Sequence, residues 1–424
     1  MYLEMGKVGL AISLLHRAAA MTPQADILCN LAIAYRQSGQ QEKMFKIFKD
    51  AIKKNPSADV LGNYAGLYVN YGTPDEAIKQ AKKAIKLDPN CKMAHWNMAL
   101  ALLEKGEWKE AWEEHEWGLK LNVRVDRKYG DIPYWDGTEG KTIIVYGEQG
   151  LGDEIMFASM LPDLIQNNKV ILECHKRLVH LFEESFPELE VHGTREDLEI
   201  DWFTGADYRV SIGSLGKWFR NDRNDFPGSP YLIADTLPSG KKFRVGISWT
   251  GGLKPGRIAA RSVPLQLWGS ILTQDCEFVS LQYTECEEDL KETEELYGIK
   301  IKRFDEVKAE DYYETAKLVN SCDLVITIAT SVYHLAGALG VPCWVMVPNK
   351  PAWREQFKGG IPWYRSVRLY RQPDGGKEMW IPVLEKVGLD LSEQLEEIRC
   401  NSFTPKAPTE NIVDTPFVME TRLQ

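Results

Sequence analysis

Residues 142–153 decide the fold of the second part of this chain, and they read TIIVYGEQGLGD. The first five residues are β-branched or aromatic, which is typical of a buried strand. Three glycines follow within six positions and predict a loop, and a helix is expected over 153–166. A strand, a glycine loop and a helix in this order form the opening unit of a parallel α/β sheet.

The same succession recurs toward the C-terminus. Further short strands are predicted at 170–174, 244–249, 277–281, 323–328 and 342–347. A second glycine loop, 250–252, follows one of these strands, and a last helix is expected over 384–398. Strands that alternate with helices indicate doubly wound parallel sheets. The two loops therefore predict two Rossmann-like lobes, at 141–240 and 241–400.

The N-terminal third of the sequence is repetitive. Three prolines are spaced by 33 residues, and three glycines keep nearly the same spacing: Pro23, Pro56, Pro89, Gly39, Gly72 and Gly106. A helix-turn-helix unit with a period of about 34 residues is the tetratricopeptide pattern. We expect a repeat array over 1–123, a turn-rich linker over 124–140 and a polar tail over 401–424. The array could offer a peptide groove or only pack on the α/β region, and the pattern leaves both open.

Composition narrows the class of protein. The net charge of −10 argues against a nucleic-acid-binding surface. Eight scattered cysteines without a CxxC pair predict reduced thiols in a cytoplasmic protein. The apolar run at 325–348 contains Pro342 and several polar residues, which predicts strand, turn and helix and not a membrane span. No signal peptide is expected at the N-terminus.

The first glycine loop supplies candidate site residues, which are Gln149, Gly150 and Gly152. Its glycines would let backbone amides approach a ligand closely. Asp153 would lie at the start of the helix, facing the carboxyl ends of the strands. Aspartate is also a common helix cap, so both a catalytic and a capping role remain open. Glu148 and Glu154 are alternative acidic groups in this region.

The second lobe supplies candidates for binding a phosphorylated ligand. Thr330 and Ser331 end a predicted strand and begin a helix, where free amides and the helix dipole favour a pyrophosphate, although an ordinary cap is the alternative. His334 lies one turn further on, on the face of Ser331. Cations follow Gly251 and would neutralise a diphosphate unless they form a solvated loop; they are Lys254, Arg257 and Arg261.

No metal site is predicted. No Asp-x-Asp ends a strand, and His175 and His180 have no carboxylate at ligand spacing. A dinucleotide-dependent oxidoreductase is disfavoured, because no GxGxxG opens either lobe in the right register.

Several motifs resemble tetratricopeptide-repeat-linked glycosyltransferases of the heptosyltransferase-like group. In chain order they are PYWDG at 133–137, GEQGLGD at 147–153, VGISW at 245–249, RSVPL at 261–265, FVSLQ at 278–282, DLVIT at 323–327, and TS with HLAGALG at 330–340, ending with WY at 363–364 and RQ at 371–372. The resemblance implies the GT-B fold, α plus α/β: helical repeats, then two facing Rossmann lobes.

The resemblance also implies a function. The first lobe would be the acceptor side, and the second would hold the nucleotide sugar, with His334 beside the donor. Asp153 would be the general base of an inverting, metal-independent transfer that needs no cofactor. The substrates would be a nucleotide diphosphate sugar and a hydroxyl of a protein or glycan acceptor, which the repeats help to recruit.

Two positions depart from the family pattern. Ala329 stands where an aspartate usually contacts the hydroxyls of the donor sugar, and the loss of one charged contact typically costs about 1.5–3 kcal/mol. Tyr333 stands where a small residue is usual. A different donor, weak catalysis or a binding relic would each account for Ala329. The alternative function is therefore a non-catalytic repeat scaffold with a degenerate glycosyltransferase domain.

Overall fold

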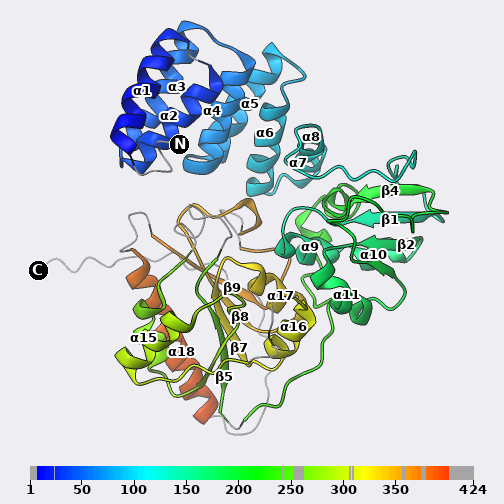
Figure 1. The fold of residues 1–424 in the computed structure, drawn as a ribbon, viewed down its shortest axis with the longest axis vertical. Coiled ribbons are helices and arrows are strands. Elements are labelled where there is room, and N and C mark those ends of the chain that lie inside the picture. The colour runs from blue at the N-terminus through cyan, green and yellow to red at the C-terminus, as the bar shows by residue number, and fades with distance from the viewer. Residues whose placement is uncertain are drawn as a thin grey trace, which may run out of the picture. The chain divides into compact units, whose positions relative to one another are not determined.

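The computed structural model describes residues 7–400 except 23, 241, 252–261, 305–306, 308–309, 356–359 and 374–378. The chain divides into two compact units, Met1–Arg124 and Val125–Gln424. Figure 1 shows that the first unit is helical and that the second contains the strands. Each unit is described here by itself.

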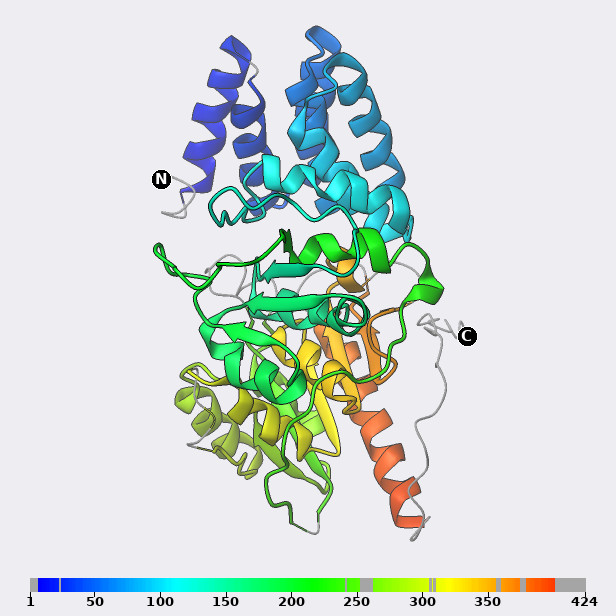
Figure 2. The ribbon, with the colours of Figure 1, turned by 90° about the vertical axis from the view of Figure 1, so that its right-hand side faces the viewer.

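The first unit is a stack of helices in which neighbours along the chain also pack on one another (Figure 2). Its helices are α1 (Val8–Met21), α2 (Ala25–Gln37), α3 (Gln41–Lys54), α4 (Ala58–Tyr71), α5 (Pro74–Leu87), α6 (Lys92–Lys105), α7 (Trp108–His115) and α8 (Trp117–Lys120). Gly39 and Gly106 have φ values of 74° and 78° at the turns, which glycine adopts without strain. Buried alanines at the repeated positions, such as Ala51 and Ala84, let the helices approach closely. The predicted helix-turn-helix repeats are confirmed.

The described part of the second unit contains two sheets, and every strand pair in them is parallel. The first sheet has the order β3-β2-β1-β4 and the second has the order β6-β5-β7-β8-β9. Their strands are β1 (Thr142–Tyr146), β2 (Lys169–Glu173), β3 (Glu190–His192), β4 (Tyr208–Ser211), β5 (Arg244–Ser248), β6 (Glu277–Ser280), β7 (Leu324–Ile328), β8 (Cys343–Val347) and β9 (Val367–Arg371). In register, Thr142 lies opposite Lys169 and Val245 opposite Leu324.

Helices accompany the strands of both sheets. The α-helices are α9 (Leu151–Ala158), α10 (Leu161–Ile165), α11 (Val179–Ser185), α12 (Gly216–Phe219), α14 (Gly269–Leu272), α15 (Glu287–Tyr297), α16 (Tyr312–Asn320), α17 (Ser331–Leu339) and α18 (Trp380–Cys400). The short 3₁₀ helices are η1 (Lys176–Leu178), η2 (Ile212–Leu215), η3 (Arg223–Asp225), η4 (Leu265–Leu267) and η5 (Trp353–Glu355). The expected architecture is confirmed as helical repeats followed by an α/β unit with two parallel sheets.

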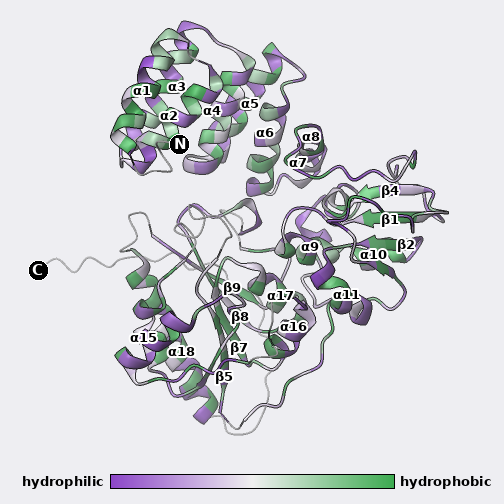
Figure 3. Cartoon of the chain, in the orientation of Figure 1, coloured by the Kyte–Doolittle hydropathy of each residue, from purple (hydrophilic) through white to green (hydrophobic). Residues whose placement is uncertain are grey.

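The central strands are apolar because both faces of their sheets are covered. Every residue of β5, β7 and β8 is buried, and Figure 3 shows hydrophobic residues along β1, β2 and β4 of the other sheet. The six strand predictions are confirmed within about one residue at each end. The last helix is longer than expected, since α18 spans Trp380–Cys400.

One helix prediction was wrong. The sequence pattern indicated a single helix over 153–166, whereas α9 begins at Leu151 and ends at Ala158, and α10 begins at Leu161. Pro162 explains the break, because a proline has no N–H to donate and its ring clashes with the carbonyl four residues earlier, here that of Ala158.

Candidate functional site

The starts of α9 and α17 pack against each other, and this contact joins the two lobes (Figure 1). A Cβ atom added to Gly152 would lie 2.7 Å from His334 Cδ2 and 3.3 Å from Ser331 Cα. Gly152 therefore allows the close approach of the two helices, a use that the loop pattern did not indicate. Gly150 differs, since its added Cβ would meet only Asp153 Oδ2, at 3.4 Å.

Asp153 lies at this junction. It is the third residue of α9, and its Oδ2 accepts a hydrogen bond of 3.1 Å from the backbone N–H of Gly150. Its Oδ1 forms an ion pair with Nη2 of Arg354, which belongs to the second lobe. Asp153 is therefore not the N-cap residue, which is Gly150; it caps the helix from its third position.

Arg354 is a site residue that the sequence did not reveal. It lies in η5, after β8, and its Nη2 also donates to Gln149 Oε1 at 3.2 Å. Gln149 has φ of 63°, an uncommon left-handed conformation for a residue with a side chain. The neighbouring Glu355 is buried and accepts a hydrogen bond of 2.7 Å from Tyr333 OH. The only hint in the sequence is a basic residue shortly after a strand.

His334 is buried in the contact between α9 and α17. Its Nδ1 lies 3.0 Å from the hydroxyl of Tyr364. Burial, and then the positive charge of Arg354, hold the pKa of His334 well below its usual 6.5, so the imidazole is neutral at neutral pH. Tyr231, beside Tyr364, donates to the carbonyl of Ile155 in α9 at 2.6 Å. In this structure His334 thus takes part in the packing of the lobes.

The start of α17 brings together the other second-lobe candidates. Thr330 is its N-cap, and its Oγ1 accepts a hydrogen bond of 3.2 Å from the N–H of Val332. Ser331 Oγ accepts one of 2.8 Å from Tyr312 OH. A Cβ atom on Gly251 would lie 2.9 Å from Thr330 Cγ2, so the second glycine loop lies directly beside this cap. The predicted cations Lys254, Arg257 and Arg261 lie outside the described residues.

Two glutamates near the first glycine loop, Glu148 in the loop and Glu154 in α9, point into the protein. Glu148 is fully buried and accepts a hydrogen bond of 2.5 Å from Ser211 Oγ, in β4. Glu154 is also fully buried, accepts one of 2.9 Å from the N–H of His175, and pairs with Arg195. Burial raises the pKa of the Glu154 carboxyl from its usual 4.5 to about 7. These contacts connect the glycine loop to β4 and the start of α9 to the segment that follows β2.

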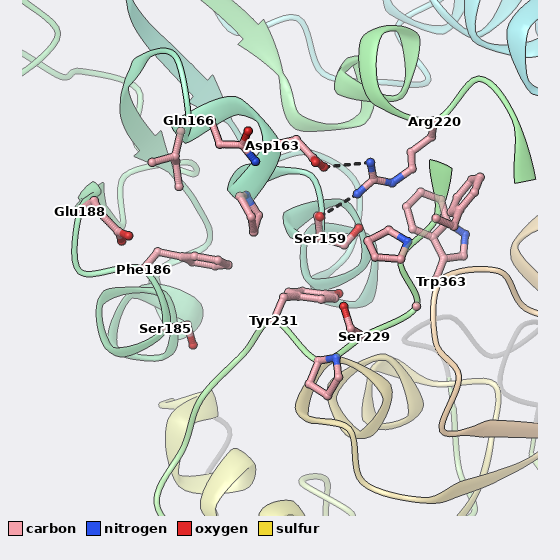
Figure 4. Close-up of a pocket in the computed structure, with 16 residues that line it drawn as sticks. Ser159, Asp163, Gln166, Ser185, Phe186, Glu188, Arg220, Ser229, Tyr231 and Trp363 are labelled. Atoms are coloured by element: carbon pink, nitrogen blue, oxygen red, sulfur yellow. Dashed lines mark hydrogen bonds and ion pairs between the residues drawn. The ribbon is translucent and has the colours of Figure 1, made fainter. Parts of the chain in front are cut away.

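A pocket of about 460 Å³ lies at the opposite end of α9, away from Asp153 (Figure 4). Arg220 spans one wall, where it donates to the carbonyl of Ser159 at 2.9 Å and pairs with Asp163 at 2.9 Å. The segment 226–231, Trp363 and the segment around Ser185 and Phe186 also line the pocket. None of the residues proposed from the sequence lines this pocket.

The histidines considered as metal ligands each lie near one carboxylate. His175 Nε2 is 3.4 Å from Glu196 Oε1, and His180 Nδ1 is 3.0 Å from Asp311 Oδ2. Within the described residues, no group of three or more histidine, cysteine, aspartate or glutamate side chains is placed to hold a metal ion.

The eight cysteines are free thiols. No helix in the described parts of the chain is both long enough and apolar enough to cross a membrane.

Comparison with known proteins identifies the repeats. Residues 25–57 and 67–114 each match a tetratricopeptide repeat family model. The curated protein FlbA of Caulobacter vibrioides is 30% identical over 337 residues, which cover 71% of this chain and 55% of FlbA. The chain therefore spans about half the length of this relative.

Among solved structures, a glycosyl transferase family 9 protein from Veillonella parvula is similar with a TM-score of 0.43 and 13% identity, over 61% of this chain and 98% of that one. The E. coli ADP-heptose lps heptosyltransferase II gives a TM-score of 0.41 and 14% identity, over 59% and 99%. These likenesses are too remote to bear on chemistry. The chain combines a tetratricopeptide repeat array with an α/β unit of two parallel-sheet lobes.

Proposed function

We propose that the second unit transfers a sugar from a nucleotide diphosphate donor to a hydroxyl of a protein or glycan acceptor, with inversion and without a metal or other cofactor. One observation carries the proposal: α9 and α17 begin against each other, and each follows the carboxyl end of a parallel strand, β1 and β7. Open parallel sheets bind their ligands outside these strand ends.

The start of α17 is the proposed donor site. Its first N–H groups and its dipole favour a diphosphate, and Thr330 and Ser331 are the residues that would border it. Lys254 and Arg261, in the segment after Gly251, would add positive charge as the diphosphate leaves. His334 would support the site by packing α17 on α9, since its ring is buried and bonded to Tyr364.

Asp153 is the proposed general base. As the acceptor hydroxyl attacks the sugar carbon, a carboxylate can take up the hydroxyl proton while the bond to the diphosphate breaks. Glu148 and Glu154 are less suited to this role, because both are fully buried and their oxygens accept hydrogen bonds from the first lobe. The repeats would recruit the acceptor.

A non-catalytic scaffold is the second candidate. Ala329 cannot accept hydrogen bonds from a donor sugar, and Asp153 is already paired with Arg354. In a scaffold the repeats would bind a partner and the α/β unit would bind a nucleotide without turnover.

A ligand screen followed by a transfer assay tests the proposal. Binding of a nucleotide diphosphate or its sugar to the native state should raise the melting temperature of the protein. With the donor so identified, Asp153→Asn should lower transfer by about 10²–10⁴-fold and leave donor binding intact. The matched control is Asp136→Asn, an exposed aspartate of the same unit, which should transfer at the wild-type rate.

The outcomes separate the two candidates. Nucleotide binding without transfer or donor hydrolysis, and no effect of Asp153→Asn, would leave the scaffold. Ala329→Asp then refines the result. A rise in affinity for the nucleotide sugar relative to the bare nucleotide would identify a degraded sugar site, and a fall would identify a site adapted to another donor.

A further inference from the structure

Arg354 joins the lobes at the point where the candidate base lies. A single nitrogen of its guanidinium, Nη2, contacts Gln149 Oε1 in the loop after β1 and Asp153 Oδ1 in the first turn of α9. The side chains of Arg354 and Asp153 are only 18% and 15% exposed. A shielded charge pair of this kind is stronger than a surface pair, because less water screens it.

The segment that carries Arg354 is fastened to the second lobe. Glu355, the next residue, accepts a hydrogen bond from Tyr333 OH of α17, and its carbonyl accepts one of 2.8 Å from Arg371 Nη2. The guanidinium carbon of Arg354 also lies 5.1 Å from the ring centre of Trp353. Arg354 is therefore held in a fixed position relative to the start of α17. Tyr333, which stands where a small residue is usual, therefore helps to hold the segment of Arg354 through its hydrogen bond to Glu355.

The Asp153 carboxylate is consequently fixed from both sides. Oδ2 accepts a hydrogen bond from the backbone N–H of Gly150, the N-cap of α9, and Oδ1 accepts one from Arg354 of the other lobe. A carboxylate has about four lone-pair directions, so these two bonds set its rotation and still leave lone pairs for a substrate proton. Misplacing a reacting group by about 1 Å can cost about 10²-fold in rate.

We infer that Arg354 is a positioning residue for the transfer reaction, which orients Asp153 only when the donor lobe is docked on the acceptor lobe. This inference rests on the proposed function. It extends that function, because the base becomes competent through a contact that the second lobe supplies.

Steady-state kinetics of Arg354→Ala tests the inference. We expect kcat to fall by about tenfold to a hundredfold and the KM for the donor to change by less than about threefold, because Arg354 acts on the base and not on the donor. Arg354→Lys should recover part of the loss, since it keeps the charge without the planar fork.

The control is Arg368→Ala. Arg368, in β9 of the same lobe, pairs with the buried Asp390 of α18 at 2.8 Å, so Arg368→Ala should leave kcat unchanged. Melting temperatures provide a second measurement that does not depend on turnover. Asp153→Asn and Arg354→Ala should each lower the melting temperature, and the double variant should lower it by less than the sum.

Each possible result either supports or overturns the positioning role of Arg354. Wild-type transfer with an unchanged kcat in Arg354→Ala would overturn the inference and leave the proposed function standing. A loss of nucleotide affinity equal to the loss of kcat would make Arg354 a donor-binding residue, which also overturns it. Absence of transfer by the wild-type protein with every donor that binds would reject the proposed function and this inference together. Additive melting-temperature changes would show that the two side chains are not coupled.

Discussion

Gly150 and Gly152 lie two residues apart in one loop, yet their surroundings differ. Gly152 faces His334 and Ser331 of the other lobe, whereas Gly150 faces only the carboxylate of Asp153. A glycine-rich loop suggests room for a ligand, but the structure assigns one of these glycines to helix packing. The sequence alone could not distinguish them, because the packing partner is distant along the chain.

A pair of alanine substitutions measures this difference. Gly152→Ala should lower the free energy of unfolding by about 1–3 kcal/mol, since the new methyl group would overlap a buried ring. Gly150 has an ordinary φ of −104°, and a Cβ added there would be uncrowded. Gly150→Ala should therefore lower the free energy of unfolding by less than about 1 kcal/mol. Urea denaturation of the full chain gives both values. Equal losses in the two variants would contradict the packing role of Gly152.

Glu154 predicts a pH dependence of stability. The pKa of its carboxyl is about 7 in the native protein, because the group is buried, and has its usual value of 4.5 in the unfolded chain. The native state therefore binds the proton more tightly, and this stabilisation is complete below pH 4.5 and is lost as the pH rises through 7. Relative to Glu154→Gln, the wild-type free energy of unfolding should fall by up to about 3 kcal/mol across that range.

The glutamine variant is the right reference, because every other titrating group is common to both proteins. Urea denaturation at a series of pH values between 4.5 and 8 provides the two curves. Parallel curves would mean that the pair with Arg195 keeps Glu154 ionised throughout.

At the scale of elements, the strands that the sequence predicted are mostly buried. β1, β7 and β8 consist mainly of apolar residues, whereas β5 also contains Arg244 and Ser248 and was recognised with the glycine loop that follows it. β3 has only three residues and is largely accessible, and the edge strand β9 carries two arginines, so neither has such a run.

The strand β4 was missed for a different reason. It contains Arg209, which is buried through an ion pair of 2.7 Å with Asp126 and by contact with the ring of Tyr134. These partners precede it by more than 70 residues, so local pattern does not reveal them. Arg354 was missed in the candidate site for the same reason, because its ion-pair partner Asp153 lies 201 residues earlier in the sequence. Sequence periodicity does not reveal charged contacts between segments that are distant along the chain.

The cap of α17 allows a prediction for an element. Thr330 Oγ1 satisfies the N–H of Val332, so Thr330→Ala should lower the free energy of unfolding by about 1 kcal/mol. Thr330→Ser keeps the hydroxyl and should retain most of that stability. Thermal and urea denaturation of both variants measure the difference. An equal loss in the serine variant would assign the effect to the methyl group that packs on Gly251 and not to the cap.

At the scale of the whole molecule, the proposed donor site belongs to only one of the two compact units. The start of α17, the loop of α9 and the Arg354 contact all lie within Val125–Gln424. The repeats belong to the other unit, Met1–Arg124, and match tetratricopeptide repeat models in their own right. Under the proposed function, donor binding and acceptor recruitment would belong to separate parts of the chain.

Amide hydrogen exchange of the full chain with ADP, GDP, UDP or pyrophosphate tests this assignment. A ligand present at about a hundred times its Kd stabilises the native state by about 2.7 kcal/mol, so exchange that requires opening of the site should slow by up to about 100-fold. We expect this protection at 147–158 and 328–339, and little change in the repeats. Pyrophosphate alone should protect 328–339, since the helix start recognises the phosphates. Protection confined to 226–231 and 185–188 would move the donor to the pocket at the other end of α9, and protection confined to 25–120 would place nucleotide binding in the repeats.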